Sequence, residues 1–256
     1  MNIYQIKLYS LEKIYYSTKT KLDLKPADVV IINANQTIEM GSVIKKEEPT
    51  SANQETIEIL RKATKEDMNT FKELKIKASK YIPICQEKAN RYNLETMKLL
   101  DADFSLDEKK LTFYFSAEGR VDFRDLVTDL VKTFKKIIRL QQIGARDEAK
   151  IIGGVGKCGR DLCCSSFLES IDSITLDVAK EQDIIFGSNK LSGYCGKLMC
   201  CLQYELGEYK HLAKNFPKVG EEIKYKRNKC RVVARNLLKQ TYTVETPDGQ
   251  RVTVEA

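Results

Sequence analysis

The sequence predicts an α+β protein built from four parts, and three observations lead to this prediction. Short apolar runs typical of strands lie near both ends of the chain, amphipathic helical stretches lie between them, and one cysteine pattern occurs twice. The predicted parts are a small N-terminal β module, a long helix with a β-β-α-β sandwich, a duplicated Cys-motif metal domain and a C-terminal SH3-like β barrel. We place their boundaries at residues 1–55, 56–145, 146–210 and 211–256.

The composition is typical of a globular protein, because 42% of the 256 residues are hydrophobic and 31% are charged. No apolar run approaches the roughly 20 residues that a membrane helix needs. The first ten residues are strand-like, so we expect no signal peptide and a cytoplasmic location. The net charge of +7 permits contact with nucleic acid without requiring it. The single histidine, His211, leaves little room for histidine chemistry and is expected at the surface.

The N-terminal module is predicted from two strands. Val29–Ile32 is a continuous apolar run of the buried-strand type. The segment 36–44 alternates, with Ile38 and Met40 on one side of the strand and Thr37 and Glu39 on the other. Residues 45–55 are polar and include a proline, which predicts a loop or linker.

A long helix follows. Thr64 and Asp67 have the spacing of a capping box. Behind them a mainly apolar pattern recurs every three to four residues, which predicts an amphipathic helix of about 25 residues. Its positions are Met68, Phe71, Lys75, Ala78, Ile82 and Cys85. Pro83 is expected to kink or interrupt this helix.

The sandwich and the C-terminal barrel are predicted from short strands. Residues 97–104 and 110–116 form a hairpin pattern, residues 123–138 are helical with one apolar face, and residues 139–143 return as a strand. Near the C-terminus four short strands, at 223–225, 230–236, 241–245 and 252–254, include a hairpin turn at Pro247–Gln250. They predict the small SH3-like barrel.

The cysteine repeat is the most specific signal in the chain. Residues 158–164 read CGRDLCC and residues 195–201 read CGKLMCC, so each cysteine recurs after 37 residues. Six of the 8 cysteines belong to this repeat. In a reducing compartment, clustered cysteines are more often metal ligands or redox groups than structural disulfides. Cys85 and Cys230 lie outside the repeat and are expected to be core residues or incidental.

Thiolates suit zinc, Cu(I) and iron–sulfur clusters. Adjacent side chains on a helix diverge by about 100°, so two neighbouring cysteines do not naturally face one site. The simplest four-thiolate set takes one cysteine of each adjacent pair, and consists of Cys158, Cys163, Cys195 and Cys200. Four thiolates hold a [4Fe–4S] cluster or a structural zinc. Cys164 and Cys201 would then form half of a second site, which a partner protein could complete.

Other interpretations of the repeat stay open at this point. Two zinc ligands in one motif usually have two to four residues between them. Here four residues lie between the outer cysteine and the next, which is the upper edge of that range. A redox dithiol would need thiols of lowered pKa. Gly154, Gly156 and Gly159 formally match a dinucleotide fingerprint, but they run directly into the cysteine motif and not into a βαβ unit. The acidic and basic residues of 146–150 are expected to brace the cysteine domain.

A basic run near the C-terminus gives a second candidate site. Single-stranded nucleic acid binds to basic, aromatic faces of small β barrels. The candidate contacts are Lys224, Lys226, Arg227, Lys229, Arg231 and Arg235. They raise the alternative hypothesis of a zinc-stabilised RNA-binding module.

Several stretches resemble the bacterial YaaT/RicT family, also called PSP-type C-terminal-domain proteins. The most specific are the two cysteine motifs, within 153–164 and 192–205. Other matching stretches are FYFSAEGRVDFR at 113–124, QIGARDEAK at 142–150, KIYY at 13–16 and EMGSV at 39–43. Together they extend over nearly the whole chain.

The resemblance implies an accessory or regulatory protein and not an enzyme. Family members are associated with a RicA–RicF–RicT complex that carries [4Fe–4S] clusters and supports RNA maturation and turnover by ribonuclease Y. The family is also linked to sporulation, competence and biofilm development. Carried over to this chain, the cofactor is a [4Fe–4S] cluster, and RicA- and RicF-like proteins and ribonuclease Y are the implied partners. The implied cluster-ligand candidates are Cys158, Cys163, Cys164, Cys195, Cys200 and Cys201.

Overall fold

The computed structural model describes residues 2–9, 14–18, 20–34, 36–47, 56–168, 171, 173–184, 191–226 and 228–255. The chain is of the α+β class, as predicted. It divides into two compact units, Met1–Gly144 and Ala145–Ala256, which are described separately. No helix within the described ranges is both long enough and apolar enough to cross a membrane.

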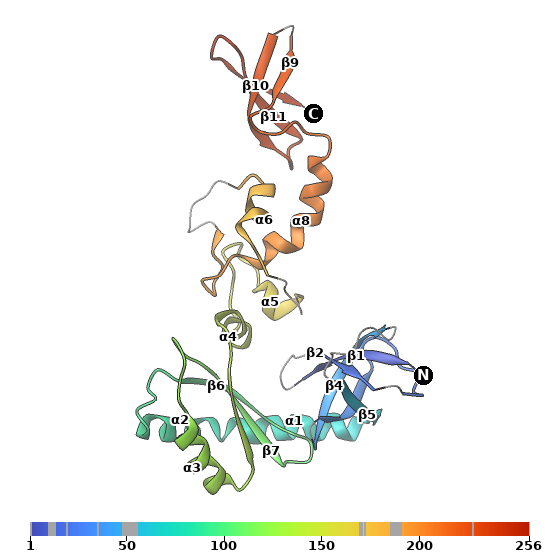
Figure 1. The fold of residues 1–256 in the computed structure, drawn as a ribbon, viewed down its shortest axis with the longest axis vertical. Helices are drawn as coiled ribbons and strands as arrows, with labels where there is room; N and C mark the ends of the chain where they lie inside the picture. The colour runs from blue at the N-terminus through green and yellow to red at the C-terminus, as the bar shows by residue number, and fades with distance from the viewer. Residues whose placement is uncertain are drawn as a thin grey trace. The chain divides into compact units, whose positions relative to one another are not determined.

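A closed five-stranded barrel begins the first unit (Figure 1). Its strands are β1 (Ile3–Leu8), β2 (Ile14–Ser17), β3 (Val29–Ala34), β4 (Thr37–Glu47) and β5 (Thr56–Lys62). The strand order is β1-β2-β5-β3-β4, and β4 closes the ring by pairing with β1. Tyr4, Ile6, Val30 and Ile32 are fully buried inside it. The predicted N-terminal β module is thus a barrel whose last strand lies beyond the predicted boundary at residue 55.

Strand β4 continues beyond the C-terminal end of the predicted strand. Both of its sides are covered near its start: Thr37, Glu39 and Met40 are buried and Ile38 is half-buried. Glu39 can be buried because Lys110 neutralises its charge. Residues 45–47, predicted as loop, continue the strand, and residues 48–55 of the predicted linker lie outside the described residues.

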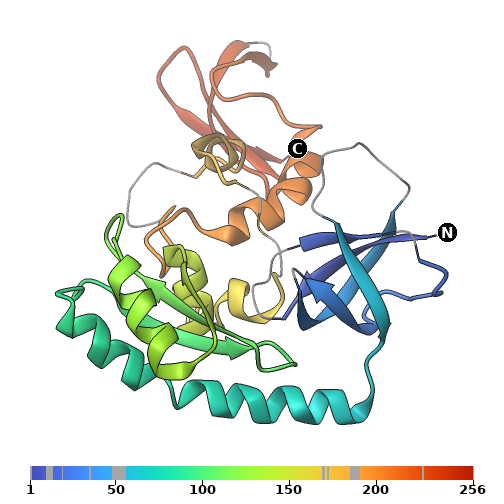
Figure 2. The ribbon, with the colours of Figure 1, turned by 60° about the horizontal axis from the view of Figure 1, so that its bottom comes forward.

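The predicted long helix is two helices, α1 (Lys65–Ser79) and α2 (Ile82–Arg91). The capping box is confirmed, since Thr64 Oγ1 accepts from the Asp67 amide at 3.2 Å and Asp67 Oδ2 accepts from the Thr64 amide at 2.7 Å. Pro83 interrupts the pattern as predicted. It lies in the first turn of α2, where its missing N–H costs little, so it begins a new helix. In Figure 2, α1 (cyan) joins the barrel strands to the rest of the unit.

A three-stranded sheet of order β6-β7-β8 completes the first unit. Strands β6 (Lys98–Phe104) and β7 (Lys110–Ser116) form the predicted hairpin, and β8 (Ile137–Gln142) runs parallel to β7 after helix α3 (Arg124–Phe134). The helix ends four residues earlier than predicted, because Lys135 adopts a left-handed conformation (φ 52°). Ile138 therefore belongs to β8. The core of this part includes Phe113, Phe115, Leu126 and Leu130.

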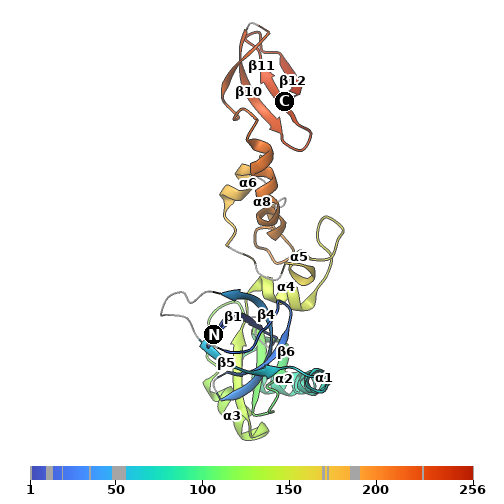
Figure 3. The same cartoon turned by 90° about the vertical axis from the view of Figure 1, so that its right-hand side faces the viewer.

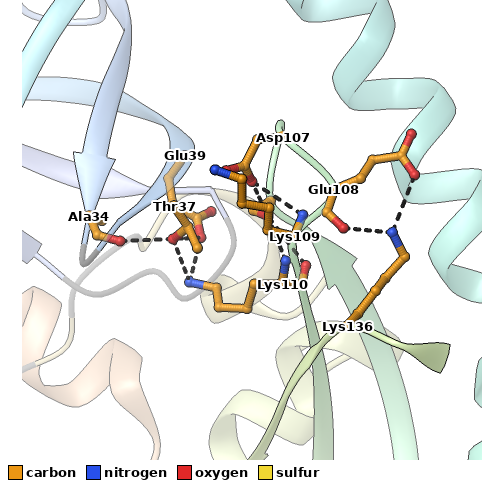
Figure 4. A network of polar contacts seen from close by, with 9 residues as sticks. Ala34, Thr37, Glu39, Asp107, Glu108, Lys109, Lys110 and Lys136 are labelled. Atoms are coloured by element: carbon orange, nitrogen blue, oxygen red, sulfur yellow. Dashed lines mark hydrogen bonds and ion pairs between the residues drawn. The ribbon is translucent and has the colours of Figure 1, made fainter. Parts of the chain in front are cut away.

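A buried polar joint connects the barrel to the β6–β7 hairpin within the first unit (Figure 4). Lys110 Nζ lies 2.5 Å from Glu39 Oε1 and donates to Thr37 Oγ1 at 3.3 Å. Next to it, the Leu106 amide donates to the Ile38 carbonyl at 2.8 Å. The barrel and the sheet are thus connected by a charged pair as well as by the chain.

The second unit contains short helices and a C-terminal sheet. The helices are α4 (Ala145–Ile152), α5 (Cys163–Ser166), α6 (Leu176–Glu181) and α8 (Cys200–Ala213). The strands are β9 (Glu222–Tyr225), β10 (Asn228–Asn236), β11 (Thr241–Glu245) and β12 (Arg251–Glu255). Helix α8 leads into this sheet (Figure 3).

All four C-terminal strands and the turn at 247–250 agree with the prediction, but the SH3-like barrel does not. The strand order is β12-β11-β10-β9, so each strand pairs with its neighbour in sequence and the sheet is an open meander. Closure would need β9 to pair with β12, and no such pair forms in the described part of the chain. A small apolar face around Cys230, Val232 and Val244 covers one side.

Candidate metal centre

The two cysteine motifs fold into the same hairpin. Val155 bridges Asp161 in the first motif, and Ser192 bridges Leu198 in the second, again 37 residues apart. The Gly156 amide donates to the Arg160 carbonyl at 2.8 Å, and the Gly193 amide donates to the Lys197 carbonyl at the same distance. The duplication seen in the sequence is therefore also a duplication of the backbone.

Each hairpin places one cysteine in its turn and one at the start of a helix. Cys158 and Cys195 precede Gly159 and Gly196, whose φ angles of 80° and 73° are of the left-handed type that favours glycine. Both motifs then begin a helix directly. Cys163 is the first residue of α5 and Cys200 is the first residue of α8.

The hairpins together surround one cavity of about 100 Å³. All six cysteines of the repeat line it: Cys158, Cys163, Cys164, Cys195, Cys200 and Cys201. Each of them is a free thiol. The structure thus brings together the whole predicted ligand set, including the second cysteine of each adjacent pair.

The thiols surround the cavity and do not converge on a single point. Cys163 and Cys200, one from each motif, share a hydrogen bond. Among the described residues, however, no three Cys, His, Asp or Glu side chains are arranged to hold one metal ion. The assignment of Cys158, Cys163, Cys195 and Cys200 as ligands stays a prediction.

Burial dominates the chemistry of the thiols. It raises the pKa of Cys163 to about 11, and the neighbouring Cys200 and Cys201 add to this effect. Burial also raises the pKa of Cys164 and of Cys201. A redox dithiol needs the opposite shift, so these three cysteines do not have the environment of reactive thiolates.

Helix α4 braces both hairpins, as predicted for residues 146–150. The Arg146 guanidinium donates to the Leu198 carbonyl of the second hairpin at 2.8 Å. Ala149 is buried with Leu162 and Cys164 of the first hairpin, and Cys195 of the second packs against the same cluster. The role of Ala149 could not be predicted, because a single alanine gives no signal in the sequence.

The second hairpin has its own small core. Val178 and Ala179 of α6 are buried against Leu202 of α8. The Gln182 side-chain amide, itself buried, donates to the Leu202 carbonyl at 2.5 Å. The start of α8, which carries Cys200 and Cys201, is therefore also held by contacts with α6 and Gln182.

The described basic candidate residues differ in their surroundings. Lys224 and Lys229 are exposed partners across β9 and β10, but Arg231 lies in register with Glu222 and Glu245. Lys226 Nζ lies 5.4 Å from the centre of the Tyr225 ring.

Arg235 is half-buried and is paired with Asp183 at 2.5 Å, so its charge is already neutralised. Arg227 lies outside the described residues. The basic residues follow closely in the sequence, but in the structure some of them lie beside acidic residues and one is held in an internal ion pair.

Three residues outside the site agree with their predicted places. His211 is exposed in the last turn of α8. Cys85 and Cys230 are buried in separate apolar cores.

Two protein-family models match parts of the chain. A family model described as the PSP1 C-terminal conserved region matches residues 57–143, and a second, described as the third domain of PSP1-like proteins, matches residues 173–216. The first match extends from β5 to β8 and slightly beyond, and the second includes the second cysteine hairpin. The fold and the repeat thus define a PSP1-type protein. No solved structure matches the chain.

Sequence identity to individual relatives identifies the family more closely. The stage 0 sporulation protein YaaT of Bacillus subtilis is 37% identical over 254 residues, which cover 98% of this chain and 92% of YaaT. The chain therefore belongs to the YaaT/PSP1 family, as the resemblance predicted. Protein PSP1 of Saccharomyces cerevisiae is 52% identical over 44 residues, 5% of its length. An uncharacterized protein of Schizosaccharomyces pombe is 27% identical over 166 residues, 22% of its length.

Proposed function

We propose that this protein is a regulatory scaffold subunit that holds a [4Fe–4S] cluster between its two cysteine hairpins. In this role it binds partner proteins and modulates RNA maturation and turnover by ribonuclease Y. The observation that carries the proposal is the cavity lined by all six repeat cysteines. The cluster would supply a redox-responsive and oxygen-sensitive element to the protein.

The arrangement of the thiols supports a cluster better than a zinc ion. Zinc binds four thiolates at about 2.3 Å from a single point. A [4Fe–4S] cluster instead takes one thiolate on each of its four irons, so its ligands surround a cage. The six thiols lie around a cavity, and no three of the described metal-binding side chains converge on one ion. This distribution fits ligands that surround a cluster.

Family membership supports the biological part of the proposal. The name of the Bacillus subtilis relative associates it with stage 0 sporulation, and no relative described above is named as an enzyme. From the resemblance we infer RicA- and RicF-like proteins as partners, ribonuclease Y as the regulated nuclease, and a cytoplasmic location. In an organism that forms spores, loss of this protein is expected to delay sporulation.

The first test is chemical. The full chain, purified without oxygen, should contain about four iron and four acid-labile sulfide per chain and should be brown. Cys158→Ser and Cys195→Ser should each lose most of this iron and sulfide. Cys85→Ala and Cys230→Ala are matched controls, since both cysteines are buried outside the cavity; both should keep the cluster.

Two outcomes contradict the proposal in different ways. Full iron and sulfide in both serine variants would show that the ligand assignment is wrong. One zinc per chain without sulfide would instead favour the zinc-stabilised RNA-binding alternative. That alternative further predicts RNA binding by the isolated protein that weakens steeply with salt.

A further inference from the structure

One helix face of α4 contacts both cysteine hairpins. Arg146 and Ala149 are three residues apart, so they lie on the same side of the helix. Ala149 packs on Leu162 of the first hairpin, and Arg146 donates to Leu198 of the second. The two halves of the site are thus held by one short helix as well as by their own contacts.

The hydrogen bond from Arg146 acts close to a proposed ligand. Leu198 precedes Met199, the N-cap of α8, and Cys200 begins that helix. Holding the Leu198 carbonyl therefore fixes the chain two residues before a cysteine that lines the cavity. Groups that orient metal ligands in this way typically contribute 10- to 100-fold to metal affinity.

Arg146 also belongs to the wall of the cavity. Its side chain is one of the cavity-lining groups and is only partly exposed. Arg160, by contrast, is exposed on the first hairpin and does not line the cavity.

We propose that Arg146 is a positioning residue of the cluster site, which clamps the second hairpin to α4 and stabilises the negative charge of a thiolate-bound cluster. The inference rests on the proposed function. Reduction of the cluster adds one electron and therefore one negative charge, so a nearby cation should favour the reduced form.

The test compares Arg146→Met, Arg146→Lys and Arg160→Met in the full chain with the cluster reconstituted without oxygen. Arg146→Met should lose iron to a chelator about tenfold faster than the unchanged protein. In a titration with dithionite followed by visible absorbance, its midpoint potential should become more negative. Arg146→Lys keeps the charge and should restore a potential close to that of the unchanged protein. Arg160→Met removes the same charge from the surface and should change neither quantity.

The outcomes separate this inference from the proposed function. If the unchanged protein takes up no iron and sulfide, both are wrong. If it takes up the cluster and Arg146→Met keeps the same iron retention and potential, only the role of Arg146 is wrong. If Arg146→Met stays empty, a loaded Arg146→Lys with a normal potential supports the inference, and an empty Arg146→Lys overturns it.

Discussion

At the scale of single residues, two glycines shape the turns that carry the outer cysteines. Gly159 and Gly196 have positive φ angles, and no atom lies within 4 Å of where their Cβ would be. An alanine there would meet no neighbour and would only strain the backbone. Gly159→Ala should therefore lower the free energy of unfolding by about 1 to 2 kcal/mol, measured in urea.

Gly207, within α8, is the matched control for this substitution. It is also free of neighbours within 4 Å, but its conformation is helical. Gly207→Ala should raise the free energy of unfolding by up to about 1 kcal/mol. Equal effects of the two substitutions would contradict the account of the turn.

Asp103 gives a pH-dependent prediction in the first unit. Burial raises the pKa of Asp103 from 3.8 to about 6, although Lys75, 2.6 Å away, opposes this shift. Between about pH 4 and pH 6 the folded state binds a proton that the unfolded state has released. Its contribution to the free energy of unfolding should therefore fall as the pH rises through this window, by on the order of 2 to 3 kcal/mol, and then level off.

Asp103→Asn should remove this slope from urea unfolding measured between pH 4 and pH 7. Asp101→Asn is the control, because Asp101 binds the same lysine at 2.6 Å but is more exposed, and the slope should persist. A slope that is unchanged in Asp103→Asn would assign the pH dependence to other groups.

At the scale of elements, the joint between β4 and β7 depends on one buried ion pair. The side chains of Lys110 and Glu39 are only 16% and 4% exposed. Lys110→Met leaves a buried carboxylate without its cation, so it should lower the free energy of unfolding by about 3 to 5 kcal/mol. The double variant Lys110→Met/Glu39→Leu should recover most of this loss, because no charge then stays buried.

Lys109→Met provides the comparison for this pair. Lys109 lies next to Lys110 in the chain, is 66% exposed, and has only a 3.4 Å ion pair with Asp107. Its loss should change the free energy of unfolding by less than about 1 kcal/mol. A similar loss of unfolding free energy in both lysine variants would show that the burial of the Lys110–Glu39 pair does not determine its contribution to stability.

The elements also show what sequence patterns can and cannot predict. The helix start at Thr64 and the hairpin at 98–116 depend on neighbouring residues, so local signals were sufficient. The burial of Thr37 and Glu39 depends on Lys110, more than 70 residues further on, and the periodicity of β4 could not reveal it. Barrel closure likewise needs the short parallel pair of β2 with β5, a long-range contact without a local signal.

At the scale of the whole molecule, the cavity lined by the repeat cysteines lies in one compact unit, and the barrel and the three-stranded sheet lie in the other. The six repeat cysteines all belong to the second unit, and the first unit has its own cores. Removal of iron by a chelator should speed amide hydrogen exchange around 155–164 and 192–205 at least tenfold, as expected if the cofactor stabilises the site. Exchange in β3 and β7 should stay unchanged. Uniform acceleration in both units would show that the site also supports the first unit.

Spacing alone was enough to single out the residues that line the cavity. The common offset of 37 residues located both hairpins and all six cysteines that line the cavity. The basic run could not reveal that Arg235 is paired with Asp183, 52 residues away in the sequence. A run of basic residues in the sequence does not by itself define a basic surface, because acidic residues that are distant in the sequence can lie next to it in the fold.

The duplicated hairpin has a kinetic consequence. A cofactor that needs thiolates from two separate chains forms at a rate that depends on how often those chains meet. Here both halves belong to one polypeptide and are held by α4, so the second half is present at a high effective concentration. Loading of the proposed cluster should therefore proceed within a single chain, and its yield should not fall when the protein is diluted.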